Sequence, residues 1–218
     1  MNRIELARYI DHTLLKPDAR SYDIERLCNE AKDNGFYSVC INPYYVSYAS
    51  GLLKDYEIKV CTVVGFPLGA SELETKVREA AQAIKNGAEE IDMVMNIGAF
   101  LDGKTDYVKN EIAEVKRAVG KHCLKVIIEI GYLDNEGIEK ASKLVKEAGA
   151  DFVKTATGFG PCGATVDAIR LIRDIVGKDF GVKAAGGIRD YKTAIAMIMA
   201  GANRLGCPRS LDILKDAK

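Results

Sequence analysis

The sequence has no surplus of charge of either sign, and this excludes several kinds of partner. Lysine and arginine together number 31, aspartate and glutamate together also number 31, and the formal net charge at pH 7 is +0. Without a basic surplus, charge alone cannot hold a nucleic-acid backbone or an anionic membrane surface. We therefore expect a small-molecule partner, with no nucleic acid and no membrane.

Histidines and closely spaced cysteine pairs are scarce as well. The two histidines, His12 and His122, are too few for a histidine-rich zinc site, so we expect neither a metal nor another cofactor. The six cysteines form no C-x-x-C pair, and most lie in apolar runs such as SVCIN and VCTVVG. This usage is typical of reduced, buried thiols, and no run reaches the roughly 18 apolar residues of a membrane span. We expect a cytoplasmic protein.

What the sequence does contain is a series of eight short apolar runs rich in β-branched residues. They span 10–15, 38–42, 59–65, 90–96, 124–130, 151–157, 180–186 and 203–207. Most are almost continuously apolar, which is typical of strands buried on both faces of a parallel sheet.

Helical patterns separate the runs. One helix is expected after Ser21, and another at the capping-box signature of Ser71 and Glu74. Further helices are expected at 43–53, 105–119, 135–148, 166–176, 191–200 and 211–216. Several end at a Gly-Ala pair, which favours a turn into the next strand.

Together these patterns predict an α/β fold, an eightfold β/α barrel formed by one domain over residues 1–218. Each strand-helix unit has about 27 residues, near the short end for such barrels. An open doubly wound sheet is the alternative, but the G-x-G-x-x-G turn after a first strand is missing.

Two lysines end neighbouring predicted strands. Lys154 lies in FVKTATG and Lys183 in GVKAAGG, while Asp92 lies among apolar residues in IDMVM. Strands in a barrel are about 4.8 Å apart, so equivalent positions bring the two ammonium groups close together. Repulsion of roughly 4 kcal/mol would lower the pKa of one amine from about 10.4 to near 7. An uncharged amine attacks a carbonyl to form a Schiff base, with Asp92 and Lys183 as a proton relay.

Two less specific interpretations stay open at this point. Lysines at strand ends often extend to solvent, and an inward Asp-Lys pair can be purely structural. The glycines favour function, since Gly158 follows strand six and Gly186-Gly187 follows strand seven. Backbone N–H groups in such turns can hold an anion.

Beyond these single residues, the chain resembles deoxyribose-phosphate aldolase along nearly its whole length. The matching phrases are IDHTLLKP (10–17), SVCINP (38–43), VCTVVGFPLGA (60–70), EIDMVMNIGA (90–99), AGADFVKTATGFG (148–160), GVKAAGGIRD (181–190) and AGANRLG (200–206). The resemblance implies a metal-free class I aldolase, a lyase of deoxyribose catabolism, on an eightfold β/α barrel. Such an enzyme reversibly cleaves 2-deoxy-D-ribose 5-phosphate to D-glyceraldehyde 3-phosphate and acetaldehyde, and we expect a homo-oligomer, a dimer or a tetramer.

The resemblance also implies roles for single residues. Lys154 matches the Schiff-base lysine, Lys183 the lysine that perturbs it, and Asp92 the carboxylate that works with Lys183. The implied phosphate contacts are Gly158, Gly186, Gly187 and Arg189, and we add Gly206 and Arg209, after strand eight, as candidate substrate- or phosphate-binding residues of this chain. Those implied to line the substrate pocket are Asp11, Thr13 and Cys40.

Departures from the family pattern cluster at the phosphate end. Ala156 replaces a serine, the turn that follows reads GPCGAT (160–165), and Pro208 and Arg209 replace two serines after strand eight. Proline lacks an N–H, but the Arg209 guanidinium could grip a phosphate or a carboxylate. One alternative is therefore the same aldol chemistry on an unphosphorylated or carboxylate-bearing aldehyde. A second alternative is a barrel that binds sugar phosphates without turnover.

Overall fold

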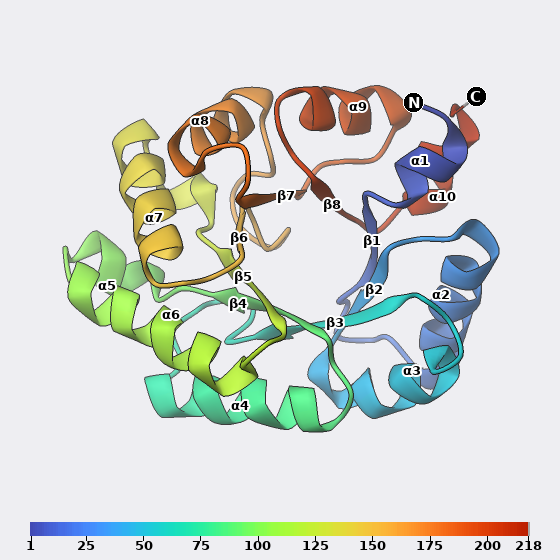
Figure 1. Cartoon of the computed structure of the whole chain (residues 1–218), viewed down its shortest axis with the longest axis horizontal. Coiled ribbons are helices and arrows are strands. Elements are labelled where there is room, and N and C mark those ends of the chain that lie inside the picture. Colours follow the sequence, from blue (N-terminus) through green and yellow to red (C-terminus); the bar gives the residue numbers. More distant parts are fainter. Residues whose placement is uncertain (218) are drawn as a thin grey trace.

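The predicted barrel is confirmed by the computed structural model, which describes residues 1–217. Its parallel strands pair in sequence order and close where β1 pairs with β8. The strands are β1 (Ile10–Leu14), β2 (Ser38–Ile41), β3 (Lys59–Val64), β4 (Glu90–Val94), β5 (Cys123–Ile127), β6 (Phe152–Lys154), β7 (Gly181–Ala185) and β8 (Arg204–Cys207). Helices enclose this ring of strands (Figure 1).

Helices follow the strands at the predicted places. They are α1 (Arg3–Ala7), α2 (Ser21–Asn34), α3 (Val46–Leu53), α4 (Leu73–Lys85), α5 (Ile97–Leu101), α6 (Thr105–Val119), α7 (Asn135–Glu147), α8 (Val166–Val176), α9 (Tyr191–Met199) and α10 (Ser210–Lys215), with the short 3₁₀ helices η1 (Pro43–Tyr45) and η2 (Ile130–Tyr132). Only α1, α5 and η2 were not predicted. Each has five residues or fewer, too few to repeat a helical period.

The capping box predicted at Ser71 and Glu74 is wrong. Helix α4 begins at Leu73, and its N-cap residue, Glu72, makes no side-chain capping bond. The start of the helix is instead fixed by Lys76, a fully buried residue of its first turn. The Lys76 ammonium group forms a 2.7 Å ion pair with Glu111 of α6.

The Gly-Ala pairs end helices as predicted. Gly87, Gly149 and Gly201 have φ values of 103°, 83° and 115°, in the region that favours glycine. At the first pair the Ala88 N–H bonds back to the Ala83 carbonyl at 3.0 Å, which satisfies the last turn of α4. The chain then enters the next strand directly.

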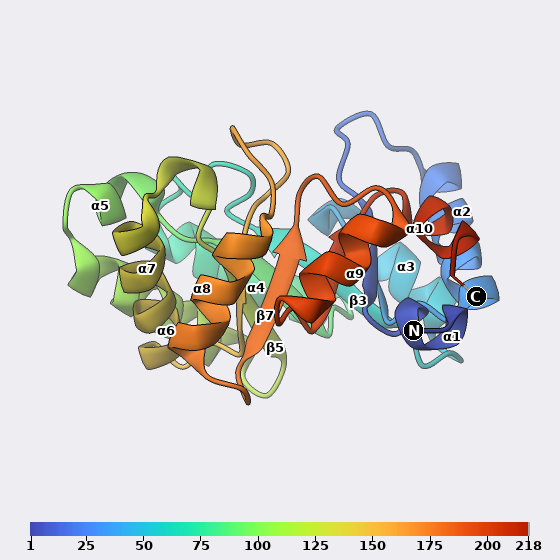
Figure 2. The same ribbon diagram turned by 90° about the horizontal axis from the view of Figure 1, so that it is seen from above.

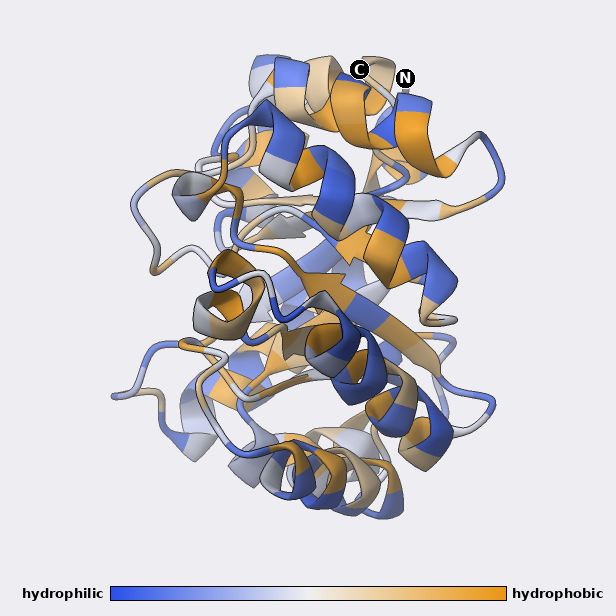
Figure 3. Cartoon of the chain, turned by 90° about the vertical axis from the view of Figure 1, so that its left-hand side faces the viewer, coloured by the Kyte–Doolittle hydropathy of each residue, from blue (hydrophilic) through white to orange (hydrophobic). Residues whose placement is uncertain are grey.

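The main hydrophobic core lies between the strands and the helices, and the barrel interior differs from it. The helical ribbons carry both hydrophilic and hydrophobic residues, as expected for one buried face and one solvent face (Figure 3). Inside the barrel a small apolar cluster of Leu15, Cys40, Cys61 and Val63 lies beside buried charged side chains. None of the helices within residues 1–217 has the length and apolarity to cross a membrane.

The carboxyl ends of the strands define one face of the molecule. The β7 arrow points toward the side on which the β1–α2 and β6–α8 loops project (Figure 2). In β/α barrels this face carries the reactive groups.

Candidate active site

Lys154 and Lys183 are direct neighbours across the β6–β7 pair, as the sequence predicts. Their Cα atoms are partners in the strand register. Neither side chain extends to solvent, since Lys154 is 2% exposed and Lys183 is 0% exposed. The interpretation of solvent-directed lysines is therefore wrong for this pair.

Asp92 of β4 connects the two lysines. Its Oδ2 atom lies 2.8 Å from Lys154 Nζ and 2.7 Å from Lys183 Nζ. Its Oδ1 atom accepts a 2.9 Å bond from Lys125 Nζ and a 3.2 Å bond from the Cys61 thiol. Since a carboxylate offers about four lone-pair positions, both oxygens are fully used.

A second carboxylate holds Lys183 from the other side. Asp11 Oδ2 lies 2.5 Å from Lys183 Nζ, while Asp11 Oδ1 accepts bonds from Arg204 at 2.9 Å and from the Ser38 hydroxyl at 2.7 Å. Asp11 was expected to line the substrate pocket. Its position makes it a counter-ion of Lys183 as well.

The sequence reasoning missed the deeper part of this cluster. Lys125 of β5 pairs with Glu90 at 2.5 Å, and Glu90 pairs with Arg204 at 2.9 Å. The Arg204 guanidinium stacks 3.5 Å from the centre of the Tyr37 ring. Lys125 carried the same signal as Lys154, a lysine inside an apolar strand (LKVIIEI), and could have been found by it.

Charge and burial together set the ionisation of the cluster. Burial by itself raises the pKa of Asp92, but the ammonium groups of Lys125, Lys154 and Lys183 outweigh it and hold that pKa well below its usual range. Burial also lowers the pKa of Lys183, yet Asp11 and Asp92 outweigh it and hold it well above its usual range. Lys183 is therefore a cation, which its predicted role requires.

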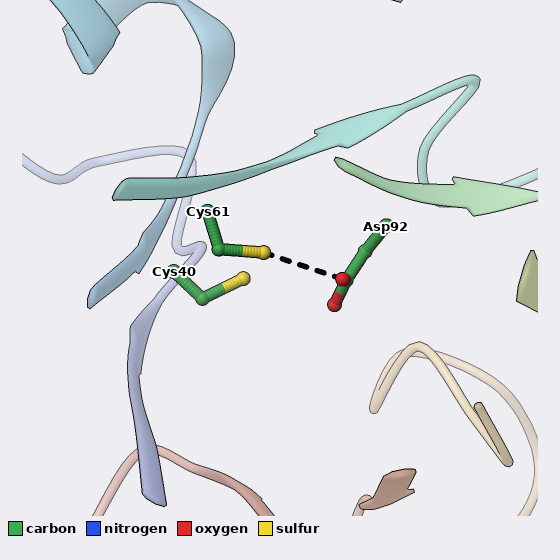
Figure 4. Close-up of side chains that lie close together, drawn as sticks. All are labelled: Cys40, Cys61 and Asp92. Carbon is green, nitrogen blue, oxygen red and sulfur yellow. Dashed lines mark hydrogen bonds between the residues drawn. The ribbon is translucent and has the colours of Figure 1, made fainter. Parts of the chain in front are cut away.

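Two thiols lie beside Asp92. Cys40 of β2 and Cys61 of β3 are register partners, and Figure 4 shows Cys61 directed at Asp92 with the Cys40 sulfur beside it. The two Sγ atoms and a carboxylate oxygen of Asp92 all lie within 4.8 Å of one another, a spacing that a metal could use. Asp92 already bonds three ammonium groups, so a cation there would have to displace a lysine. The donor set does not fit a resident metal.

Thr13 and Gly206 complete the wall around the lysines. Thr13 pairs in register with Cys40, and its hydroxyl donates a 2.8 Å bond to the Asp11 carbonyl. A Cβ atom at Gly206 would lie 3.1 Å from Lys183 Cε, so glycine leaves room for that side chain.

The predicted phosphate loops lie at the same end of the barrel. Gly186 and Gly187 turn with φ values of 86° and 81° after β7. An added Cβ at Gly158 or Gly187 would meet nothing within 4 Å, so both backbones face open space. The exposed Arg189 follows two residues after Gly187.

Arg209 occupies a different side of the mouth. It is exposed and lines a cavity of about 370 Å³ together with Thr13, Pro208 and Ser210. His12, in the wall of the same cavity, hydrogen-bonds the Ser210 hydroxyl at 2.8 Å and Glu30 at 2.7 Å. His12 therefore has partners for both ring nitrogens and ties β1 to α2 and α10.

Glu129 fixes the loop that follows Lys154. Its backbone has a φ of 50°, an uncommon conformation for a residue other than glycine. Its buried carboxylate accepts 3.2 Å bonds from the Thr157 N–H and a further bond from the Thr157 hydroxyl. A Cβ at Gly160 would lie 2.7 Å from this carboxyl group, so the loop packs closely over it.

Comparisons with known proteins agree with this geometry. Residues 6–210 match the model of the DeoC/LacD family aldolases. Deoxyribose-phosphate aldolase of Caldanaerobacter subterraneus subsp. tengcongensis is 56% identical over 218 residues, which cover 99% of this chain and 94% of the relative. The enzyme of the same name from Aciduliprofundum boonei is 57% identical over 217 residues, covering 99% and 98%.

Solved structures show the same likeness. An aldolase named QR15 superposes with a TM-score of 0.94 at 44% identity, covering 98% of this chain and 96% of the other. Deoxyribose phosphate aldolase from Aeropyrum pernix, described as having a unique tetrameric structure, superposes with a TM-score of 0.89 at 33% identity, covering 98% and 91%.

Proposed function

Because the chain belongs to the DeoC/LacD family of aldolases and is a Schiff-base aldolase that cleaves deoxyribose phosphate, we propose that Lys154 is its attacking amine. The observation that carries this proposal is the shared oxygen of Asp92, which lies 2.8 Å from Lys154 and 2.7 Å from Lys183. One carboxylate thus connects a nucleophile at the mouth with an ammonium group behind it.

The proposed amine belongs to a buried cluster of charged side chains. Three carboxylates and four cationic groups are joined by ion pairs in this part of the chain: Asp11, Glu90, Asp92, Lys125, Lys154, Lys183 and Arg204. Among its three lysines, Lys154 is 2% exposed whereas Lys125 and Lys183 are 0% exposed, so Lys154 is the amine that a substrate can reach.

Cleavage then follows from an iminium at Lys154. The amine condenses with the open-chain aldehyde of the sugar, and the iminium nitrogen accepts electrons as the bond between C2 and C3 breaks. This bond is the one whose cleavage leaves a two-carbon fragment on the enzyme and releases glyceraldehyde 3-phosphate. The Asp92–Lys183 pair takes the proton of the C3 hydroxyl and returns a proton to C2. Hydrolysis frees acetaldehyde.

We assign the phosphate to the loops after β6 and β7, where the backbone of Gly158, Gly186 and Gly187 can hold it and Arg189 supplies charge. Arg209 lines a separate cavity and has no part in this assignment. If the phosphate is bound there, kcat/KM for 2-deoxyribose 5-phosphate exceeds that for 2-deoxyribose, and Arg189→Met narrows the difference. Equal values for the two sugars would favour an unphosphorylated or carboxylate-bearing aldehyde. If the enzyme cleaved both sugars equally well, the proposed role of Lys154 would still stand.

A direct test of the amine compares two lysine variants. Lys154→Met should abolish cleavage of 2-deoxyribose 5-phosphate, while Lys178→Met, an exposed lysine on the loop before β7, should retain wild-type turnover. Circular dichroism verifies that both variants fold. Substantial cleavage by folded Lys154→Met would overturn the proposal.

We also propose a homo-oligomeric, cytoplasmic enzyme. The similar solved structure from Aeropyrum pernix is described as tetrameric, and this supports the proposed homo-oligomer. A non-catalytic barrel has no support, since the matching family and the curated relatives are aldolases.

A further inference from the structure

Cys40 and Cys61 form a thiol pair that the aldol mechanism does not use. They lie on adjacent strands β2 and β3, directly opposite in the register. Neighbouring strands are about 4.8 Å apart, and disulfides span Cα separations of roughly 4.4–6.8 Å. The Sγ atoms already lie within 4.8 Å of each other, so small side-chain rotations suffice to join them.

The surroundings of the pair distinguish the two thiols. The pKa of the Cys40 thiol is lowered, because its contact with the Cys61 side chain and the nearby Lys183 and Lys154 charges outweigh the effect of burial. Burial raises the pKa of Cys61 well above its usual range, so this thiol keeps its proton, and its S–H donates to Asp92 Oδ1 at 3.2 Å. One member is thus an activated thiol, and the other is a protonated thiol with a base in contact.

We propose that Cys40 and Cys61 are a modification site at which hydrogen peroxide forms a reversible intrachain disulfide inside the barrel. In the first step the Cys40 thiolate attacks one peroxide oxygen. An S–O bond forms, the O–O bond breaks, and hydroxide leaves. In the second step Cys61 attacks Cys40 Sγ, the S–S bond forms, the S–O bond breaks, and the proton of the Cys61 thiol passes to the leaving hydroxide, which becomes water. Two thiols and one peroxide give one disulfide and two waters.

The disulfide would act on the aldol site through Asp92. Oxidised Cys61 has no S–H, so Asp92 Oδ1 loses one of its two donors. Cys40 also turns away from its place beside the carboxylate. Oxidation should therefore lower turnover and a thiol reductant should restore it, an effect on activity that rests on the proposed function. The cross-link itself does not rest on it.

Access to the pair gives a second prediction. Cys40 is 0% exposed, and its sulfur lies near Asp92, which contacts Lys154, so we expect peroxide to reach it from the Lys154 side of the cluster. Saturating 2-deoxyribose 5-phosphate should slow the cross-link several-fold.

The test treats the full chain with hydrogen peroxide and follows it by mass spectrometry. The expected product is an intact mass lower by two hydrogens and, in a non-reduced digest, a Cys40–Cys61 linked peptide that dithiothreitol separates. Cys61→Ser keeps a donor to Asp92 but should give no cross-link, and a dimedone adduct should accumulate on Cys40. Cys28→Ser, which alters a thiol buried on α2, should cross-link as the wild type does.

Other outcomes would overturn the site. In the wild type, Cys40 could stay free for alkylation after peroxide treatment, or it could oxidise to the sulfinic acid with no linked peptide. A disulfide could also form through the exposed Cys162 instead. Cross-linking of a chain that proves unable to cleave the sugar would leave this site standing and refute only the proposed function.

Discussion

Asp92 is the residue at which the charges of the barrel meet. It contacts the ammonium groups of Lys125, Lys154 and Lys183. Lys154 and Lys183, to which we assign the chemistry, share Oδ2, and Lys125 lies on Oδ1. Lys125 therefore fixes the orientation in which Asp92 presents Oδ2 to the reacting groups.

Replacement of Lys125 tests this positioning role. Lys125→Met keeps the length of the side chain but leaves Glu90 and Asp92 short of one buried cation. Loss of one partner of a buried ion pair should lower the free energy of unfolding by about 3–5 kcal/mol, measured by urea denaturation. Turnover should fall too, because Asp92 is free to rotate.

A partly exposed lysine on another strand of the barrel is the control. Lys59 of β3 pairs with Glu89, and the two side chains are 44% and 40% exposed. Lys59→Met should change stability by no more than about 1 kcal/mol and leave turnover unchanged. Equal losses in the two variants would show that the burial of Lys125 has no special effect.

The residues of the site were predictable in part. Lys154, Lys183 and Asp92 are polar residues inside apolar strands. Strand register brings the two lysines together once the barrel is recognised, and Asp92 reaches them from β4. The second role of Asp11 could not be found this way, because its 2.5 Å contact with Lys183 depends on side-chain directions across the barrel. The side of the mouth that Arg209 faces also depends on loop geometry, which no periodicity encodes.

At the scale of elements, the buried pair of Lys76 and Glu111 holds α4, α6 and the loop after β3 together. Lys76 Nζ also donates to the carbonyls of Gly69 at 2.7 Å and Val94 at 3.0 Å. These contacts fix the start of α4 more strongly than a capping box could. The strands and longer helices followed from local patterns, whereas this helix start was set by a residue 35 positions away in the sequence.

Substitution of this pair separates charge from packing. Lys76→Met leaves a buried, uncompensated Glu111 and should lower the free energy of unfolding by about 3–5 kcal/mol. The double variant Lys76→Met/Glu111→Leu removes both charges and should be more stable than the single variant in the same urea titration. Lys85→Met, at the exposed end of α4, is the control. A double variant less stable than the single one would contradict this assignment.

At the scale of the whole molecule, the barrel interior predicts how stability depends on pH. The pKa values of Asp11 and Asp92 are lowered: burial opposes the shift, and the surrounding lysines, with Arg204 at Asp11, outweigh it. The native state therefore binds fewer protons than the unfolded state once the pH falls below about 3.9. Stability should be fully present above that pH and should be lost as the pH falls further.

Denaturant titrations from pH 6 down to pH 2 measure this loss. Asp11→Asn should show a shallower dependence of unfolding free energy on pH than the wild type, because one titrating group is gone. Asp33→Asn, an exposed position on α2, should follow the wild-type slope. If the unfolding free energy of Asp33→Asn depended less steeply on pH than that of Asp11→Asn, the assignment of the acid-sensitive stability to Asp11 would be refuted. On the alkaline side the raised pKa of Lys183 keeps its stabilisation in place until the pH rises above its usual value of about 10.4.

The most direct test of the amine assigned to catalysis is chemical trapping. The folded chain is incubated with acetaldehyde and borohydride at neutral pH, digested, and mapped by mass spectrometry. The expected result is a reduced two-carbon adduct on the peptide that contains Lys154, and none on those that contain Lys125 or Lys183. An adduct on either of those lysines, or no adduct on a chain that still cleaves the sugar, would contradict the assignment.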